Sequence, residues 1–127
     1  MKILIADDEV RQRQLLGLML SKYDCAIVEA GTGLEAVTAA KRERPDLIIM
    51  DHHMPEMPGY EAIKEIRKDP AMGKVPFVMV TIDPHIQGRQ EEEALEGCAY
   101  LPKPYSQEQL LSTISVAIGK TFPLIKQ

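Results

Sequence analysis

Short, strongly apolar runs alternate with longer amphipathic stretches along almost the whole chain. The apolar runs lie at residues 2–6, 25–30, 46–50, 76–81 and 99–101. Uninterrupted apolar runs of this kind predict strands that are covered on both faces, as in a parallel sheet. The stretches between them predict helices at 9–22, 34–44, 59–68 and 90–96, followed by a last helix that begins near Ser106. Strands and helices in regular alternation predict an α/β domain with a doubly wound sheet.

The last helix has the clearest sequence signals. Leu110 and Ile114 fall on one apolar stripe, which Leu111 and Ile118 extend. Ser106 is a suitable N-cap and Gln109 stands at the third helical position, which is the pattern of a capping box. A glycine at position 119 predicts the end of the helix.

Length and charge narrow the class of protein. The 127 residues carry a net charge of −4, and we expect one domain over 1–120, with 121–127 as a C-terminal tail or the start of a linker. The acidic balance argues against direct nucleic acid binding by this chain. The apolar start, MKILIA, meets Asp7 too early for a signal peptide or a membrane span, so we expect a cytoplasmic protein.

Polar residues collect where the predicted strands end. Asp7 and Asp8 follow the first strand, Asp51 the third, Thr81 closes the fourth, and Lys103 comes shortly after the fifth. The carboxyl ends of parallel strands meet at one edge of the sheet, where ligands bind. Converging carboxylates repel one another unless a hard cation lies among them, and Mg²⁺ suits such oxygens. With a lysine and a hydroxyl opposite, the set predicts an aspartyl-phosphate site.

Four motifs in order connect the chain to a known family. They are ADDE (6–9), MDHHMPEMPG (50–59), VT (80–81) and YLPKP (100–104). With these motifs the chain resembles the receiver domain of bacterial two-component response regulators, from Lys2 to about Ile118. The resemblance implies five β-α units with strand order 2-1-3-4-5. It also implies a signalling phosphoacceptor that is not a turnover enzyme.

The resemblance assigns a role to each acidic residue. Asp51 would accept a phosphoryl group from a histidine kinase or a histidine phosphotransfer protein. Asp8 would be the main side-chain ligand of Mg²⁺, with Mn²⁺ as a possible substitute. Asp51 and the backbone carbonyl of His53 would also bind the ion, and Asp7 would reach it partly through water.

The same resemblance describes a switch. Lys103 would bind the phosphoryl oxygens, and the Lys103–Pro104 peptide bond would be cis. Thr81 would be drawn to the phosphoryl group, and Tyr100 would rotate into the space it leaves, although simple core packing also accounts for a tyrosine here. The surface of the fourth helix, fifth strand and fifth helix would change, which makes it the expected contact for an unknown output partner or for a second copy in a homodimer.

Three residues beside these positions are candidates for tuning access and reaction rate. Ile82 stands where the family usually has a small residue, so its bulk predicts a narrower entrance and slower exchange with small donors or water. His53 and Asp83 are expected to influence attacking water.

Other kinds of site remain to be weighed. His52 and His53 beside Asp51 could form a zinc-type cluster, but adjacent side chains on an extended segment point opposite ways, and Mg²⁺ prefers oxygen ligands. GTGLEA (31–36) imitates a dinucleotide-binding fingerprint, yet a complete β-α unit precedes it and Glu29 would lie close to a pyrophosphate.

Two related folds also use parts of this pattern. A haloacid-dehalogenase-like phosphatase would need Asp-x-Asp after the first strand, and a flavodoxin-like FMN binder would need a phosphate loop there, which ADDE would repel. A receiver-like interaction module that works without phosphorylation remains the alternative. Cys25 and Cys98 are expected to be free, buried thiols at opposite edges of the sheet.

Overall fold

Five strands and four helices make up the described part of the chain. The computed structural model describes residues 1–82 and 95–122. The strands are β1 (Lys2–Ala6), β2 (Ala26–Ala30), β3 (Leu47–Asp51), β4 (Phe77–Thr81) and β5 (Ala99–Pro102). The helices are α1 (Val10–Leu20), α2 (Gly33–Glu43), α3 (Gly59–Arg67) and α5 (Gln107–Ile118). Each agrees with its sequence prediction to within two residues at either end.

All five strands form one parallel sheet in the order β2-β1-β3-β4-β5. This confirms the predicted α/β architecture and strand order. The register places Ala6 of β1 opposite Met50 of β3, and Asp51 opposite Val80 of β4. Most of the helix predicted at 90–96 lies outside the described residues, and Leu95–Gly97, at its end, form a turn.

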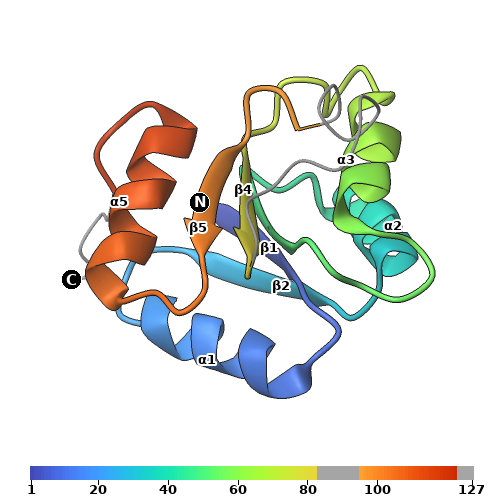
Figure 1. The fold of residues 1–127 in the computed structure, drawn as a ribbon. Helices are drawn as coiled ribbons and strands as arrows, with labels where there is room; N and C mark the ends of the chain where they lie inside the picture. Colours follow the sequence, from blue (N-terminus) through green and yellow to red (C-terminus); the bar gives the residue numbers. More distant parts are fainter. Residues whose placement is uncertain (83–94, 123–127) are drawn as a thin grey trace.

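The sheet separates two apolar cores. Helices α2 and α3 cover one face, while α1 and α5 cover the other (Figure 1). Every residue of β3 and β4 is buried, because helices lie over both sides of these central strands. Burial on both faces explains why these strands are apolar without alternation, and it makes them rigid supports for residues at their ends.

The predicted capping of the last helix is confirmed. The Ser106 hydroxyl accepts from the Gln109 amide at 3.1 Å, and the Gln109 side chain accepts from the Ser106 amide at 2.8 Å. Gly119 ends α5 with φ of 71°, a left-handed conformation that costs glycine little. The last turn of α5 therefore ends where the sequence indicates.

The chain beyond α5 packs back onto the domain. Phe122 is buried, and its ring lies edge-on to Tyr23 with centroids 5.7 Å apart. The Ser115 hydroxyl is 3.0 Å from both the amide nitrogen and the carbonyl oxygen of Phe122. The packed unit thus includes residues just past position 120, where we expected a tail to begin.

Two sequence expectations concern single features of the surface. Cys25 and Cys98 are not joined in a disulfide, and they lie next to the two edge strands β2 and β5 as expected. We predicted buried thiols, but both are only half-buried, because an edge strand is less covered than a central one. No helix within residues 1–82 and 95–122 is long and apolar enough to cross a membrane.

Candidate functional site

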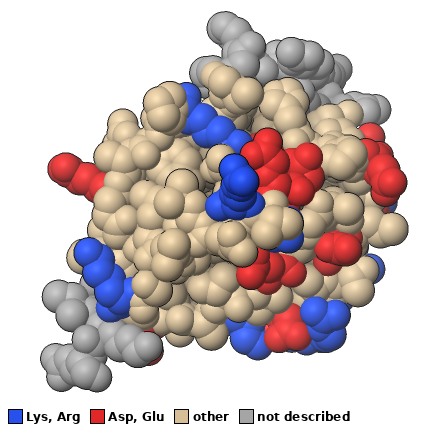
Figure 2. All heavy atoms as spheres, turned by 90° about the horizontal axis from the view of Figure 1, so that it is seen from below, with Lys and Arg blue, Asp and Glu red and all other residues tan. Residues whose placement is uncertain are grey.

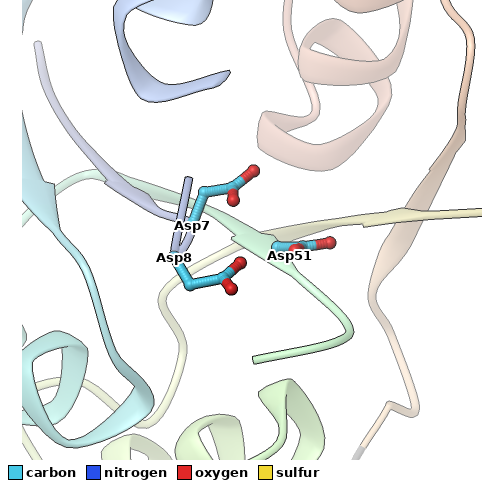
Figure 3. A group of neighbouring side chains, drawn as sticks. All are labelled: Asp7, Asp8 and Asp51. Atoms are coloured by element: carbon cyan, nitrogen blue, oxygen red, sulfur yellow. The ribbon is translucent and has the colours of Figure 1, made fainter. Parts of the chain in front are cut away.

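Three carboxylates meet where β1 and β3 end. Asp7 and Asp8 directly follow β1, and Asp51 is the last residue of the neighbouring β3. One oxygen from each of the three side chains lies within 4.8 Å of the others, and Figure 3 shows the groups gathered at the strand ends. Asp7 and Asp51 are buried, at 4% and 7% exposure, whereas Asp8 is exposed. The structure thus brings together the acidic residues that the sequence singled out.

Burial makes this cluster electrostatically unfavourable by itself. Loss of solvation raises the pKa of Asp7 to about 6, and the charges of Asp51 and Asp8 add to the increase. Burial also raises the pKa of Asp51, while Lys103 and a backbone hydrogen bond from His53 oppose that rise. All three groups offer carboxylate oxygens, which are the donors that a hard divalent cation requires. The cluster therefore fits a metal ion that would relieve its repulsion.

Lys103 supplies the positive charge opposite the carboxylates. Its ammonium nitrogen lies 3.5 Å from an Asp51 oxygen. Its backbone amide donates to the carbonyl oxygen of Thr81 at 2.8 Å, which fixes the lysine against the end of β4. The Lys103–Pro104 peptide bond is cis. The loop after β5 therefore presents its lysine toward the end of β3.

Thr81 and Tyr100 lie on the adjacent strands β4 and β5. Thr81 has no exposed surface. Tyr100 is half-buried and packs against the core under α2 and α3. Ile82, one residue after Thr81, is 72% exposed and so extends from the strand end into solvent. Asp83 lies outside the described residues.

Arg13 holds the loop that carries the acidic pair. This residue of α1 donates to the Asp7 carbonyl oxygen at 2.5 Å and to a Glu29 carboxylate oxygen at 3.1 Å. The Asp7 side chain in turn accepts from the Glu9 amide at 2.9 Å. Arg13 was not among the residues predicted from the sequence. Its signal was an arginine in the helix that follows ADDE, facing an acid near the end of the second strand.

Two glycines allow close contacts around Asp51. The amide of Gly59 donates to the His52 carbonyl oxygen at 3.1 Å. A Cβ on Gly59 would come within 2.7 Å of the Asp51 carbonyl oxygen, and one on Gly33 would come within 2.6 Å of the Met57 carbonyl oxygen. These are steric clashes with backbone, so only glycine fits at either place. The loop between β3 and α3 is thereby packed against α2.

The rings of His52 and His53 lie close together, so the predicted opposite orientation of the two side chains is wrong. We expected His52 and His53 to point opposite ways, yet their rings lie 4.8 Å apart between centroids and are tilted by 30°. The reason is that β3 ends at Asp51 and the chain bends at His52, so strand alternation no longer applies. Among the described residues, the group of three or more possible metal ligands contains Asp7, Asp8 and Asp51 and neither histidine.

Comparison with known proteins identifies this arrangement. The family model for the response regulator receiver domain matches residues 3–115. A probable transcriptional regulator, ycf27 of Guillardia theta, is 35% identical over 120 residues, and the match covers 94% of this chain and 46% of that protein. The chain thus spans about half the length of this relative.

Two solved structures are similar over almost their whole length. The chemotaxis protein CheY4 of Vibrio cholerae superposes with a TM-score of 0.83 at 32% identity, covering 91% of this chain and 97% of that one. The receiver domain of the sensor histidine kinase PA1611 from Pseudomonas aeruginosa gives 0.81 at 30% identity, covering 94% and 98%. That structure holds a magnesium ion coordinated in its active site cleft. The present chain belongs to the response regulator receiver domain family, signalling modules that work with a kinase in two-component systems and are not turnover enzymes.

Proposed function

We propose that the chain is a phosphoacceptor in which Asp51 takes a phosphoryl group from a histidine kinase or a histidine phosphotransfer protein. The observation that carries this proposal is the position of the Asp51 carboxylate. It ends a fully buried strand, belongs to a group of three acids whose oxygens lie within 4.8 Å, and has the Lys103 ammonium 3.5 Å away. A rigid strand end holds a nucleophile in a defined direction, which favours transfer.

Magnesium would be the resident ion of the acidic cluster, with Mn²⁺ as a substitute. Asp8 and Asp51 would bind it through their side chains, His53 through its backbone carbonyl, and Asp7 partly through water. The bound ion would neutralise negative charge on the phosphoryl group. Asp8 is exposed and can reach an ion that arrives from solvent, while burial keeps Asp7 in place.

The protein's own groups would share the remaining work. A carboxylate oxygen of Asp51 attacks phosphorus, the bond to the donor's leaving group breaks, and that group departs with the electron pair. The Lys103 ammonium stabilises the phosphoryl oxygens as charge develops. A donor phosphohistidine whose second ring nitrogen carries a proton leaves as neutral imidazole, so no further proton has to be supplied.

The phosphoryl group would also act as a switch. Thr81 would donate its hydroxyl to a phosphoryl oxygen, and Tyr100 would turn inward on the neighbouring strand. The surface formed by β5, α5 and the helix predicted at 90–96 would then change its affinity for an output partner or for a second copy of the chain. Such a change needs a two-state element biased by a local charge, which this pair would provide.

Three further residues would tune the rates at which the phosphoryl group is gained and lost, without forming or breaking bonds themselves. They are Ile82, His53 and Asp83. Ile82 lines the same groove as Lys103 and is 72% exposed, and its side chain would narrow the approach to Asp51 from solvent. An Ile82→Ala variant should therefore react faster with acetyl phosphate. His53 and Asp83 would act on the water that removes the phosphoryl group.

The decisive experiment is intact mass spectrometry after incubation with acetyl phosphate or phosphoramidate, with Mg²⁺ or with EDTA. We expect one phosphoryl adduct that is labile to alkali, depends on Mg²⁺ and is absent from Asp51→Asn. If neither donor nor beryllium fluoride modifies the wild-type protein, the phosphoacceptor function is wrong. The chain would then be an interaction module that works without phosphorylation.

A further inference from the structure

A second pocket lies at the amino end of the sheet, between the loop that joins α2 to β3 and the loop that joins α3 to β4. Its volume is about 420 Å³, and its lining includes Arg44, Asp46, Met72, Lys74 and Val75. Strand β3 begins beside it at Leu47 and ends at Asp51. Five residues of extended strand span about 15 Å, so this pocket is separate from the proposed phosphoacceptor site.

Two exposed cations line the pocket, Arg44 from the first loop and Lys74 from the second. Within residues 1–82 and 95–122, neither side chain forms a salt bridge or a hydrogen bond. Asp46 also lines the pocket, but its carboxylate accepts from the Lys2 backbone amide at 2.7 Å. Two unpaired cations beside one engaged carboxylate leave an excess of positive charge in the pocket.

Positive charge continues onto the last turns of α2 and α3, which lead into the two loops. Lys68 pairs with Glu65 at 2.8 Å and is the main reason why the pKa of Glu65 is lowered. Lys41 and Lys64 lower that pKa further, so both lie near the same carboxylate. The α1 side of the molecule differs, since a broad area there has no charged side chains (Figure 2). A chain with a net charge of −4 thus concentrates several cations beside this pocket.

The backbone of Arg44 adopts a conformation that is unfavourable for arginine. Its φ of 48° and ψ of 63° are left-handed, and the residue ends α2. Glycine or asparagine is usual at such a helix end, because a Cβ is crowded there. Pro45 follows directly, and a residue before proline favours extended conformations. The local structure therefore gives no reason for a long cationic side chain at this position, and strain of this kind is typical of functional sites.

The rest of the lining is largely apolar. Met72 is 3% exposed, Val75 is half-buried, and Pro45 is buried. An occupant with an aliphatic side chain between carboxylates would match both the apolar surface and the cations. Nucleic acid fits less well, because it presents closely spaced phosphates and an acidic protein repels them.

We propose that this pocket docks an acidic segment of a partner protein. Carboxylates of the segment would pair with Arg44 and Lys74, and one aliphatic side chain would pack against Met72 and Val75. This interaction lies at the end of the sheet opposite Asp51 and does not depend on phosphorylation.

The experiment measures fluorescence anisotropy of a fluorescein-labelled peptide, Glu-Asp-Glu-Leu-Glu-Asp-Glu, titrated with the full chain at low ionic strength. The variants Arg44→Gly and Lys74→Gln each remove one cation of the pocket. Arg11→Gln is the matched control, because it removes an exposed charge from α1 and changes the net charge equally. A second peptide carries serine in place of leucine.

We expect Arg44→Gly and Lys74→Gln each to raise the Kd of the leucine peptide about three-fold, as for the loss of one exposed ion pair. Arg11→Gln should leave the Kd at the wild-type value. The serine peptide should bind the wild type about five-fold more weakly, because it lacks the apolar contact. Arg44→Gly should not lower the thermal midpoint, since glycine adopts the left-handed conformation readily, so its loss of binding is not a folding defect.

Four results would overturn the proposal. An equal loss of binding in Arg11→Gln would show that net charge alone attracts the peptide. A serine peptide that binds as well as the leucine peptide, or a wild type that binds neither, would remove the specific pocket. Tighter binding of labelled oligothymidylate would assign the cations to nucleic acid. A dimer in sedimentation experiments that Arg44→Gly dissociates would assign the pocket to a second copy of the chain.

Discussion

Acidic side chains at the two ends of the sheet lie in opposite electrostatic environments. At the amino end, Asp46 is exposed and accepts from the Lys2 backbone amide at 2.7 Å, while the Lys2 ammonium pairs with Glu43 at 3.2 Å. At the carboxyl end, Asp7 and Asp51 are buried beside each other with Lys103 opposite. The first arrangement is satisfied by the chain itself. The second leaves buried carboxylates whose charges repel one another and which are able to hold a metal ion.

The pKa directions express the same difference. Arg42 and Lys2 hold the pKa of Glu43 below its usual value, so the folded state favours the charged form of this side chain. Burial raises the pKa of Asp7 and of Asp51, so their charges oppose the fold. Groups that weaken stability where ligands bind are typical of functional sites. The contrast teaches that the carboxyl end is arranged for binding at some cost in stability, and each prediction below tests it.

The largest expected effect comes from adding one methyl group at the carboxyl end of the sheet, and the same addition at the amino end serves as its control. Gly59→Ala places a Cβ 2.7 Å from the Asp51 carbonyl oxygen and 2.9 Å from the Met79 methyl carbon. Overpacking against backbone should lower the free energy of unfolding by about 2–3 kcal/mol. It should also slow phosphorylation, because the end of β3 has to shift. Urea unfolding and the intact-mass assay measure the two effects.

Gly73→Ala is the matched control in the loop that enters β4 from the amino end. The nearest atoms to a Cβ there are 3.7 to 3.9 Å away, which is ordinary contact. This variant should change the unfolding free energy by less than about 1 kcal/mol and leave phosphorylation unaffected. Equal losses in the two variants would show that the carboxyl end is no more tightly specified than the amino end.

The next effect reverses the usual sign of a core mutation. Asp7→Asn removes a charge that is buried and repelled, so the metal-free protein should become more stable by about 1–3 kcal/mol. The same change at exposed Asp46 keeps an oxygen acceptor for the Lys2 amide and should alter stability by less than about 0.5 kcal/mol. Thermal and urea unfolding in EDTA give both numbers. Destabilisation by Asp7→Asn would contradict the electrostatic account of the cluster.

The pH dependence of stability follows from the same group. Asp7 has a pKa of about 6 in the fold and an ordinary value of 3.8, so between these pH values the folded state binds more protons than the unfolded state. The unfolding free energy in EDTA should therefore fall as pH rises through this window and level off above it. The raised pKa of Asp51 acts in the same direction. Asp7→Asn should flatten the curve, and a curve unchanged by that substitution would refute the assignment.

The α/β class and the acidic group could be predicted well because both depend on short-range patterns, whereas the strand order was implied by the family resemblance. Uniformly apolar strands require burial on both faces, and parallel strands bring their carboxyl ends together whatever the helices contain. Asp7, Asp8 and Asp51 could thus be placed side by side from two strand ends. Ser106 and Gly119 were predictable for the same reason, since capping depends on a few adjacent residues.

Features that depend on side chains from distant segments were not predictable. Arg13 of α1 contacts Asp7 after β1 and Glu29 of β2. Phe122, beyond α5, packs on Tyr23, which lies just after α1. The predicted orientation of His53 relative to His52 was wrong because the chain bends after β3, and packing of the following loop determines this bend. Period-two reasoning holds only while a strand lasts.

The smallest expected effect concerns Arg13, whose side chain is mostly buried and binds the Asp7 carbonyl oxygen. Two physical roles predict opposite signs for Arg13→Met. If the arginine positions the loop of Asp7 and Asp8, its loss should weaken Mg²⁺ binding about ten-fold, as for other groups that orient metal ligands. If only its charge mattered, removing a cation from the site should tighten Mg²⁺ binding.

Arg11→Met removes an exposed charge from the same helix and measures the electrostatic contribution alone. Isothermal titration with Mg²⁺ distinguishes the cases, and we expect weaker binding in Arg13→Met with slightly tighter binding in Arg11→Met, because the carboxyl end needs its ligands held in place before the ion arrives.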